Sequence, residues 1–194
     1  TSFLTTIAAS YVLRFFIYGL LGVILSLIIL RYYNFYNNIL FLSLVLLTFI
    51  SLLSIIVFPI FRQTKNKFLN RILKILDEWN IMRKNYNFLF KILLLDLGLW
   101  VVRSLKLFFV FKAFSFDIPF IFILLISVLS IISVFISLTP AGLGVVEAVV
   151  AFSAEVVGIG FVGGLYAGVL DRVVTVIIIF ILGPIFSYRL MKDY

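Results

Sequence analysis

The sequence predicts an all-α polytopic membrane protein. Of its 194 residues, 64% are hydrophobic and only 12% are charged, whereas a soluble domain carries about a quarter charged residues. Apolar runs of the roughly 20 residues needed to cross a bilayer recur along the whole length, and a glycine-rich break interrupts them in the last third. We therefore expect a single transmembrane domain over residues 1–194. It should contain about five spanning helices, a broken or re-entrant helix at 139–157 and an interfacial amphipathic helix at 66–84.

Each expected span is located by a run of apolar residues. The runs cover residues 6–30, 38–61, 88–111, 118–138 and 165–188. Charges within such runs are unusual, because a charged side chain at the bilayer centre costs about 2.5 to 3.5 kcal/mol. The charges found there are Arg14, Lys91, Asp96, Arg103, Lys106, Asp171 and Arg172.

Residues 62–85 form the one markedly polar segment. Apolar side chains recur at helical spacing over 68–82 and the charges lie largely off that face, which predicts the interfacial helix at 66–84. The segment carries seven Lys or Arg against two acids, so the positive-inside rule places loop 62–85 in the cytoplasm of a cell-membrane, multi-pass protein. A solvated connector is the alternative.

The side of the membrane that holds the C-terminus stays open. A re-entrant 145–157 would leave the chain end outside, whereas a broken span at 139–162 would leave it inside. The basic tail favours the second arrangement.

Composition excludes several function classes. The chain contains no Cys and no His, which removes disulfides, thiol chemistry, zinc sites and imidazole catalysis. Neither a Walker loop nor a nucleophile elbow is present. We therefore expect no catalytic residue, no metal and no cofactor. The net charge of +8 fits cytoplasmic loops and anionic headgroups rather than nucleic acid.

The stretch TPAGLGVVEAVVAFSAE breaks the backbone among the apolar runs. Pro140 removes a hydrogen-bond donor, while Gly142 and Gly144 permit turns that other residues avoid. At membrane depth such a break must be buried in protein or line a wet cavity. The helix beginning near Val145 would point free N–H groups toward the break, an arrangement that suits a phosphate. An ordinary interfacial turn is the alternative.

Two carboxylates follow the break, Glu147 and Glu155. A carboxylate in the membrane needs a partner or water, and Arg172 and Arg103 are the candidates. Asp96 and Arg103 lie about 20° apart around one helix axis, so both should face the bundle interior. A proton or headgroup relay, a structural ion pair and an interfacial carboxylate all fit this pattern.

The start of the last span combines a glycine repeat with a charged pair. Gly160, Gly164 and Gly168 form overlapping GxxxG steps, which indicate close helix packing rather than ligand contact. Asp171 and Arg172 point in directions about 100° apart, so they cannot easily share one partner.

These motifs resemble the flippase-like integral membrane family, also described as the lysylphosphatidylglycerol synthase transmembrane region. The family's pattern is P-x-G-[LI]-G-V-x-E, followed by an Arg-containing helix that closes with a G or P-G element. The matching residues are Pro140, Gly142, Leu143, Gly144, Val145 and Glu147, then Gly158, Arg172, Gly183 and Pro184. Ala141 stands where many members carry glycine, and the family's N-terminal portion is missing. The chain is therefore expected to be a fragment lacking the N-terminal spans.

The resemblance implies lipid handling. We expect an integral membrane protein that binds and translocates or presents a polar lipid, either an aminoacylated phospholipid or a lipid-linked sugar. The expected headgroup-binding residues are Pro140, Gly142, Gly144, Glu147, Arg172, Arg103 and Asp96. Besides membrane lipids, the expected partners are an aminoacyl-transferase or a glycosyltransferase, and a homo-oligomer is left open. A non-catalytic anchor for a lipid-modifying transferase is the main alternative, and an integral membrane transferase using Asp96 or Glu147 as base is a weaker one.

Overall fold

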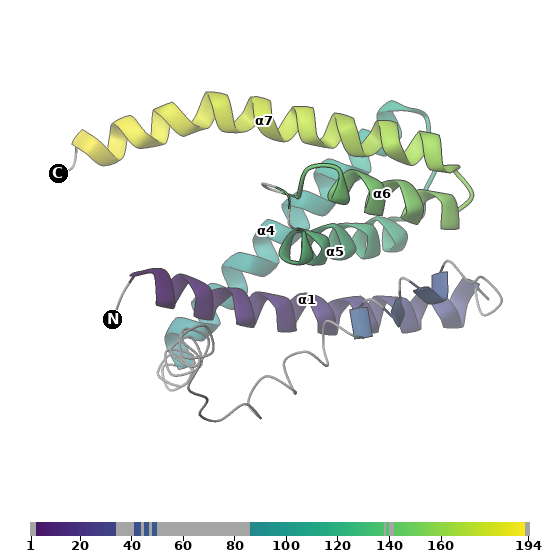
Figure 1. Cartoon of the computed structure of the whole chain (residues 1–194), viewed down its shortest axis with the longest axis horizontal. Helices are drawn as coiled ribbons and strands as arrows, with labels where there is room; N and C mark the ends of the chain where they lie inside the picture. Colours follow the sequence, from purple (N-terminus) through teal and green to yellow (C-terminus); the bar gives the residue numbers. More distant parts are fainter. Residues whose placement is uncertain are drawn as a thin grey trace.

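The protein is a bundle of long helices (Figure 1). The structure is a computed structural model that describes residues 3–33, 41–43, 45–46, 48–49, 86–137, 139 and 142–192. Its labelled helices are α1 (Phe3–Tyr33), α4 (Tyr86–Ala113), α5 (Phe120–Ile136), α6 (Val145–Val156) and α7 (Phe161–Lys192). Every regular element in the described ranges is helical, which confirms the predicted all-α class.

Four of the five expected spans overlap these helices. Four of the apolar runs lie in α1, α4, α5 and α7, and the short run after the glycine break forms α6. Among the described residues, two segments are long and apolar enough to cross a membrane, Arg14–Tyr33 and Phe161–Arg189. The amphipathic helix expected at 66–84 and most of the span expected at 38–61 lie outside the described residues.

The helices pack in layers. Figure 1 shows α5 and α6 between α1 and α7, with α4 running across them. α1 packs on α5, α5 on α6 and α6 on α7, while α4 contacts both α5 and α7. Side chains of α4 can therefore meet those of α7 directly, although the two helices are far apart in sequence.

The centre of the bundle is α5. Its Ile123, Val128 and Leu129 are fully buried, because a helix that is apolar all round can only be covered on every side by other helices or by lipid. The buried hydroxyl of Ser127 accepts a hydrogen bond from Trp100 Nε1 of α4 at 2.8 Å. An indole N–H and a hydroxyl thus satisfy each other inside the apolar core.

The second half of α7 has an apolar surface that the described helices do not cover. Consecutive large side chains there are exposed, up to 76% for Phe180. A contiguous apolar patch of this kind is unfavourable in water and favourable against acyl chains. The exposed side chains therefore fit a helix that lies in a bilayer.

Candidate functional site

The helical backbone is interrupted between α5 and α6. α5 ends at Ile136, and Ser137 is extended, with φ −69° and ψ 135°. Gly142 and Gly144 then adopt φ values of 70° and 81°, a left-handed region that glycine enters without steric cost. A Cβ on Gly142 would also come within 2.9 Å of Val146 Cγ2. Pro140, the first residue of the predicted headgroup site, lies outside the described residues.

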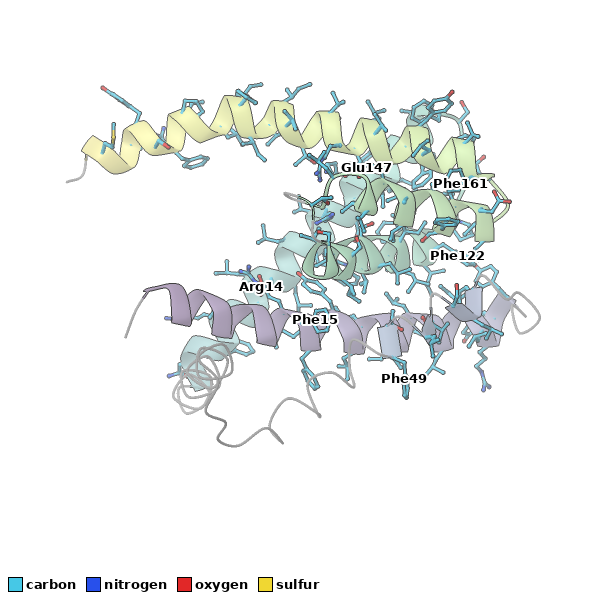
Figure 2. All side chains as sticks on the ribbon, viewed as in Figure 1. Arg14, Phe15, Phe49, Phe122, Glu147 and Phe161 are labelled. Atoms are coloured by element: carbon cyan, nitrogen blue, oxygen red, sulfur yellow. The ribbon has the colours of Figure 1, made fainter. Side chains whose placement is uncertain are left out.

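Glu147 closes the amino end of α6. Its Oε2 accepts a hydrogen bond from the Gly144 main-chain N–H at 2.8 Å, which satisfies one of the donors that every helix start leaves free. The other oxygen, Oε1, lies 3.5 Å from Nε of Arg172 on α7. Glu147 is buried, and Figure 2 shows it at the start of α6, beneath α7. One carboxylate therefore links the helix break to the neighbouring helix.

Lys106 of α4 forms a second polar link to α7. Its ammonium donates to the main-chain oxygen of Asp171 at 3.3 Å and to Thr175 Oγ1 at 2.5 Å. The Asp171 carboxylate oxygen Oδ1 lies 2.9 Å away. The buried Oδ1 accepts no hydrogen bond from the described residues. Lys106 and the Asp171 carboxylate are therefore paired by charge. Lys106 thus donates two hydrogen bonds to α7, and the Asp171 carboxylate offsets its charge.

The adjacent residues Asp171 and Arg172 thus engage different helices. Asp171 pairs with Lys106 of α4, and Arg172 pairs with Glu147 of α6. The angle of about 100° between successive helical residues explains this division. α7 is therefore tied by charges to two helices within one turn.

These two ion pairs line a common cavity of about 470 Å³. Its polar wall also includes Arg103 of α4 and Thr175 of α7, whereas Val134 of α5 contributes an apolar side. The remaining lining residues are Leu99, Val102, Val146, Gly168, Ile178 and Ile179. Several of these apolar side chains are largely exposed on the outer surface of the bundle, among them Leu99, Val102 and Ile179. The cavity therefore joins a charged interior to an apolar rim.

Arg103 differs from the other cations of this cavity. Its side chain lines the cavity, but it makes no ion pair or hydrogen bond within the described part of the chain. A guanidinium carries five N–H donors in a fixed fork. Arg103 consequently offers free donors to whatever enters the cavity.

Asp96 is not part of this cavity. Its carboxylate lies 3.0 Å from Nε of Arg14 on α1, and its main-chain oxygen accepts a hydrogen bond from the Tyr18 hydroxyl at 3.4 Å. Arg14 lies on the α1 side of the bundle, in a different layer from Glu147 (Figure 2). Although Asp96 and Arg103 share a helix face, α4 crosses the bundle, so their positions meet different neighbouring helices.

The glycines at the start of α7 have different surroundings. A Cβ on Gly164 would lie 2.4 Å from Ala154 Cβ, and one on Gly168 would lie 3.2 Å from the Glu147 Cα. α6 and α7 therefore approach closely at both positions. Gly160 lies in the turn before α7 with φ 91°, where its conformation rather than its size is the constraint.

Two functional candidates were not singled out by the sequence patterns. Lys106 stands three positions after Arg103, a spacing that places both on one helix face. Thr175 stands four positions after Asp171 and donates to its main-chain oxygen at 2.7 Å. The helical spacing of these residues can be read from the sequence. The contact between α4 and α7, which brings them together, cannot.

The fold and the cavity define a class: an all-helical membrane protein with a charged cavity between its helices. A comparison with protein families matches residues 1–183 to the family described as the lysylphosphatidylglycerol synthase TM region. The chain belongs to this family, and it is thus a membrane protein related to lipid modification. Neither the curated proteins nor the solved structures that were compared gave a match.

Proposed function

We propose that this chain binds the headgroup of a polar lipid in the cavity between α4, α6 and α7, and that it translocates the lipid or presents it across the bilayer. The observation that carries the proposal is the combination of a charged interior with an exposed apolar rim. An amphiphile has the same two parts, and its tails would stay among rim residues such as Val102 and Ile179 while its headgroup enters.

The polar residues have separate roles in this proposal. Arg103 and Arg172 contact headgroup oxygens, because a guanidinium fork matches the geometry of phosphate. Glu147 balances Arg172 and holds the amino end of α6 through Gly144. Because Glu147 occupies the Gly144 amide, phosphate can reach that amide only if Glu147 moves aside. Asp96 contributes indirectly, by fixing α4 against α1 through Arg14.

A protein cavity of this kind lowers the barrier to lipid movement. A charged group placed at the bilayer centre costs about 2.5 to 3.5 kcal/mol even on favourable insertion scales. Paired charges inside the bundle would replace the water that a headgroup loses. The proposal includes a multi-pass arrangement in the cell membrane with loop 62–85 in the cytoplasm, as the basic composition of that loop favours.

The test combines Glu147→Gln with Arg172→Ala and measures lipid translocation in reconstituted vesicles. A fluorescent phospholipid in the inner leaflet is followed as it becomes accessible to an added quencher. The double variant is expected to lose at least tenfold in rate. The matched control, Lys112→Gln, removes a charge from α4 outside the cavity and should keep the rate. An unchanged rate in a folded double variant would rule the proposal out.

A further inference from the structure

The cavity contains two opposite charges that attract each other without forming a contact. Arg103 of α4 and Asp171 of α7 both line it, and their charges interact favourably. Within the described part of the chain, however, they form neither an ion pair nor a hydrogen bond with each other. A gap therefore separates the guanidinium from the carboxylate.

The carboxylate of Asp171 has unused capacity to accept hydrogen bonds. Its side chain keeps 15% of its surface exposed, and its buried Oδ1 accepts no hydrogen bond from a described residue. Lys106 offsets the charge from 2.9 Å, but it donates its hydrogen bonds to the main-chain oxygen of Asp171 and to Thr175 Oγ1. A buried acceptor that lacks a donor is unfavourable, so a ligand that supplies a donor is favoured.

Arg103 has unused capacity of the opposite kind. A guanidinium carries five N–H donors, and no described residue accepts from those of Arg103. A ligand that joins the two side chains needs an anionic acceptor for Arg103 and a hydrogen-bond donor for Asp171. A phosphodiester headgroup that also carries a hydroxyl or an ammonium group has both parts.

We infer that Asp171 is a specificity-determining residue, and that the cavity prefers headgroups with an O–H or N–H donor beside the phosphodiester. This inference rests on the proposed function and names the chemical feature by which the substrate is selected. Arg103 donates to the phosphate oxygens, and the Asp171 carboxylate accepts from the hydroxyl or ammonium group. A headgroup that ends in trimethylammonium has no N–H, so it leaves the carboxylate without a donor.

The test measures the binding of matched lipid pairs to the purified chain by native mass spectrometry, with both lipids of a pair present in equal amounts. The first pair is phosphatidylethanolamine and phosphatidylcholine, which have the same net charge and differ in N–H donors. The second pair is phosphatidylglycerol and phosphatidylmethanol, which share a phosphodiester monoanion and differ in hydroxyl groups. We expect the lipid with the donor to be preferred at least fivefold in each pair.

A methylated lipid controls for the size of the headgroup. N,N-Dimethyl-phosphatidylethanolamine is nearly as large as phosphatidylcholine but keeps one N–H donor. It should therefore be preferred over phosphatidylcholine at least threefold. Equal binding of these two lipids, with phosphatidylethanolamine preferred over both, would show that size decides and would overturn the inference.

Two variants assign the preference to Asp171. Asp171→Asn leaves a weaker acceptor, because charge-assisted hydrogen bonds are about twice as strong as neutral ones, and it should reduce the preference for phosphatidylethanolamine at least threefold. Lys106→Met combined with Asp171→Leu replaces the ion pair by apolar side chains, an exchange that is often neutral for stability. This double variant should abolish the preference in both pairs, whereas Lys112→Gln, outside the cavity, should leave both unchanged. A preference that survives in the folded double variant would overturn the assignment.

The outcomes separate this inference from the proposed function. Equal binding within either matched pair would overturn the role of Asp171 as an acceptor for both kinds of donor, and it would leave lipid binding standing. If no lipid bound to the chain, the inference and the proposed function would both fail. Displacement of phosphatidylethanolamine by an equal concentration of glycerophosphoethanolamine, which has no tails, would overturn the lipid assignment, because the cavity would then bind soluble phosphodiesters.

Discussion

Asp171 and Arg172 show how two neighbouring residues can organise a membrane bundle. One pairs with Lys106 on α4 at 2.9 Å and the other with Glu147 on α6 at 3.5 Å. Each pair offsets the cost of placing charges among apolar helices. Charges in such a place are expected to hold helices together or to face a polar ligand. These residues hold α4, α6 and α7 together, and they also line the cavity.

At the residue scale, the shorter ion pair should contribute more to stability. We expect Lys106→Met to destabilise the fold by about 2 to 3 kcal/mol, since it leaves the buried Asp171 Oδ1 without its cation. Glu147→Gln should cost about 1 to 2 kcal/mol, because the ion pair is longer and the amide oxygen still accepts from Gly144. Thermal unfolding in detergent micelles measures both. The reverse order would contradict this account of the two pairs.

A double-variant cycle checks that Glu147 and Arg172 act on each other. The coupling free energy between Glu147→Gln and Arg172→Gln is expected to be about 1 kcal/mol, since the two side chains are in contact. The pair Lys112→Gln and Arg172→Gln is the reference, with no shared contact and therefore an expected coupling within about 0.5 kcal/mol of zero. Equal coupling in the two cycles would show that the ion pair is not formed.

The sequence predicted which polar residues face the bundle interior better than it predicted which of them form ion pairs. Arg103 was placed on an inward face from its helical position, and Arg172 was named as a candidate partner of Glu147. The pairing of Lys106 with Asp171 was missed, because it depends on α4 crossing the bundle to meet α7. No local pattern encodes the crossing of two helices that are far apart in the chain.

At the scale of elements, the interface between α6 and α7 depends on small residues. Gly164→Ala would place its Cβ 2.4 Å from Ala154 Cβ and 2.7 Å from the Ala151 Cα. Because one of these atoms belongs to the backbone, α6 and α7 must separate, at an expected cost of about 1 to 3 kcal/mol. Thermal unfolding measures this change in stability.

Gly98→Ala provides the control for this glycine substitution. Gly98 lies within α4, and a Cβ there would meet nothing within 4 Å. Alanine should be neutral or stabilise the helix by about 0.5 to 1 kcal/mol, since it has the smaller entropy cost. If both alanine variants had the same stability, the close approach of α6 and α7 at Gly164 would be refuted.

The elements themselves were largely predictable. Apolar runs located α1, α4, α5 and α7, and the shortness of the run after the glycine break indicated α6. The break was readable because Gly142 and Gly144 are the residue type that adopts positive φ freely. The role of Glu147 in closing the start of α6 was not predicted, since a free helix start and a closed one have the same sequence pattern.

At the scale of the whole molecule, the charged cavity is continuous with the exposed apolar surface of the helices. The cavity carries the polar residues of α4, α6 and α7, and its rim continues into side chains that face outward. Under the proposed function, a lipid enters the cavity laterally and its tails remain in the bilayer. Family membership relates the chain to lipid modification, and the proposed function locates lipid binding in this cavity.

The central claim is that a lipid headgroup occupies this cavity, and cysteine protection tests it most directly. The chain has no native cysteine, so Thr175→Cys in the cavity wall and Thr139→Cys in the exposed break can each be labelled alone. Added phosphatidylglycerol should slow modification of Thr175→Cys at least fivefold and leave Thr139→Cys unchanged. Equal rates at Thr175→Cys with and without the lipid would contradict the claim.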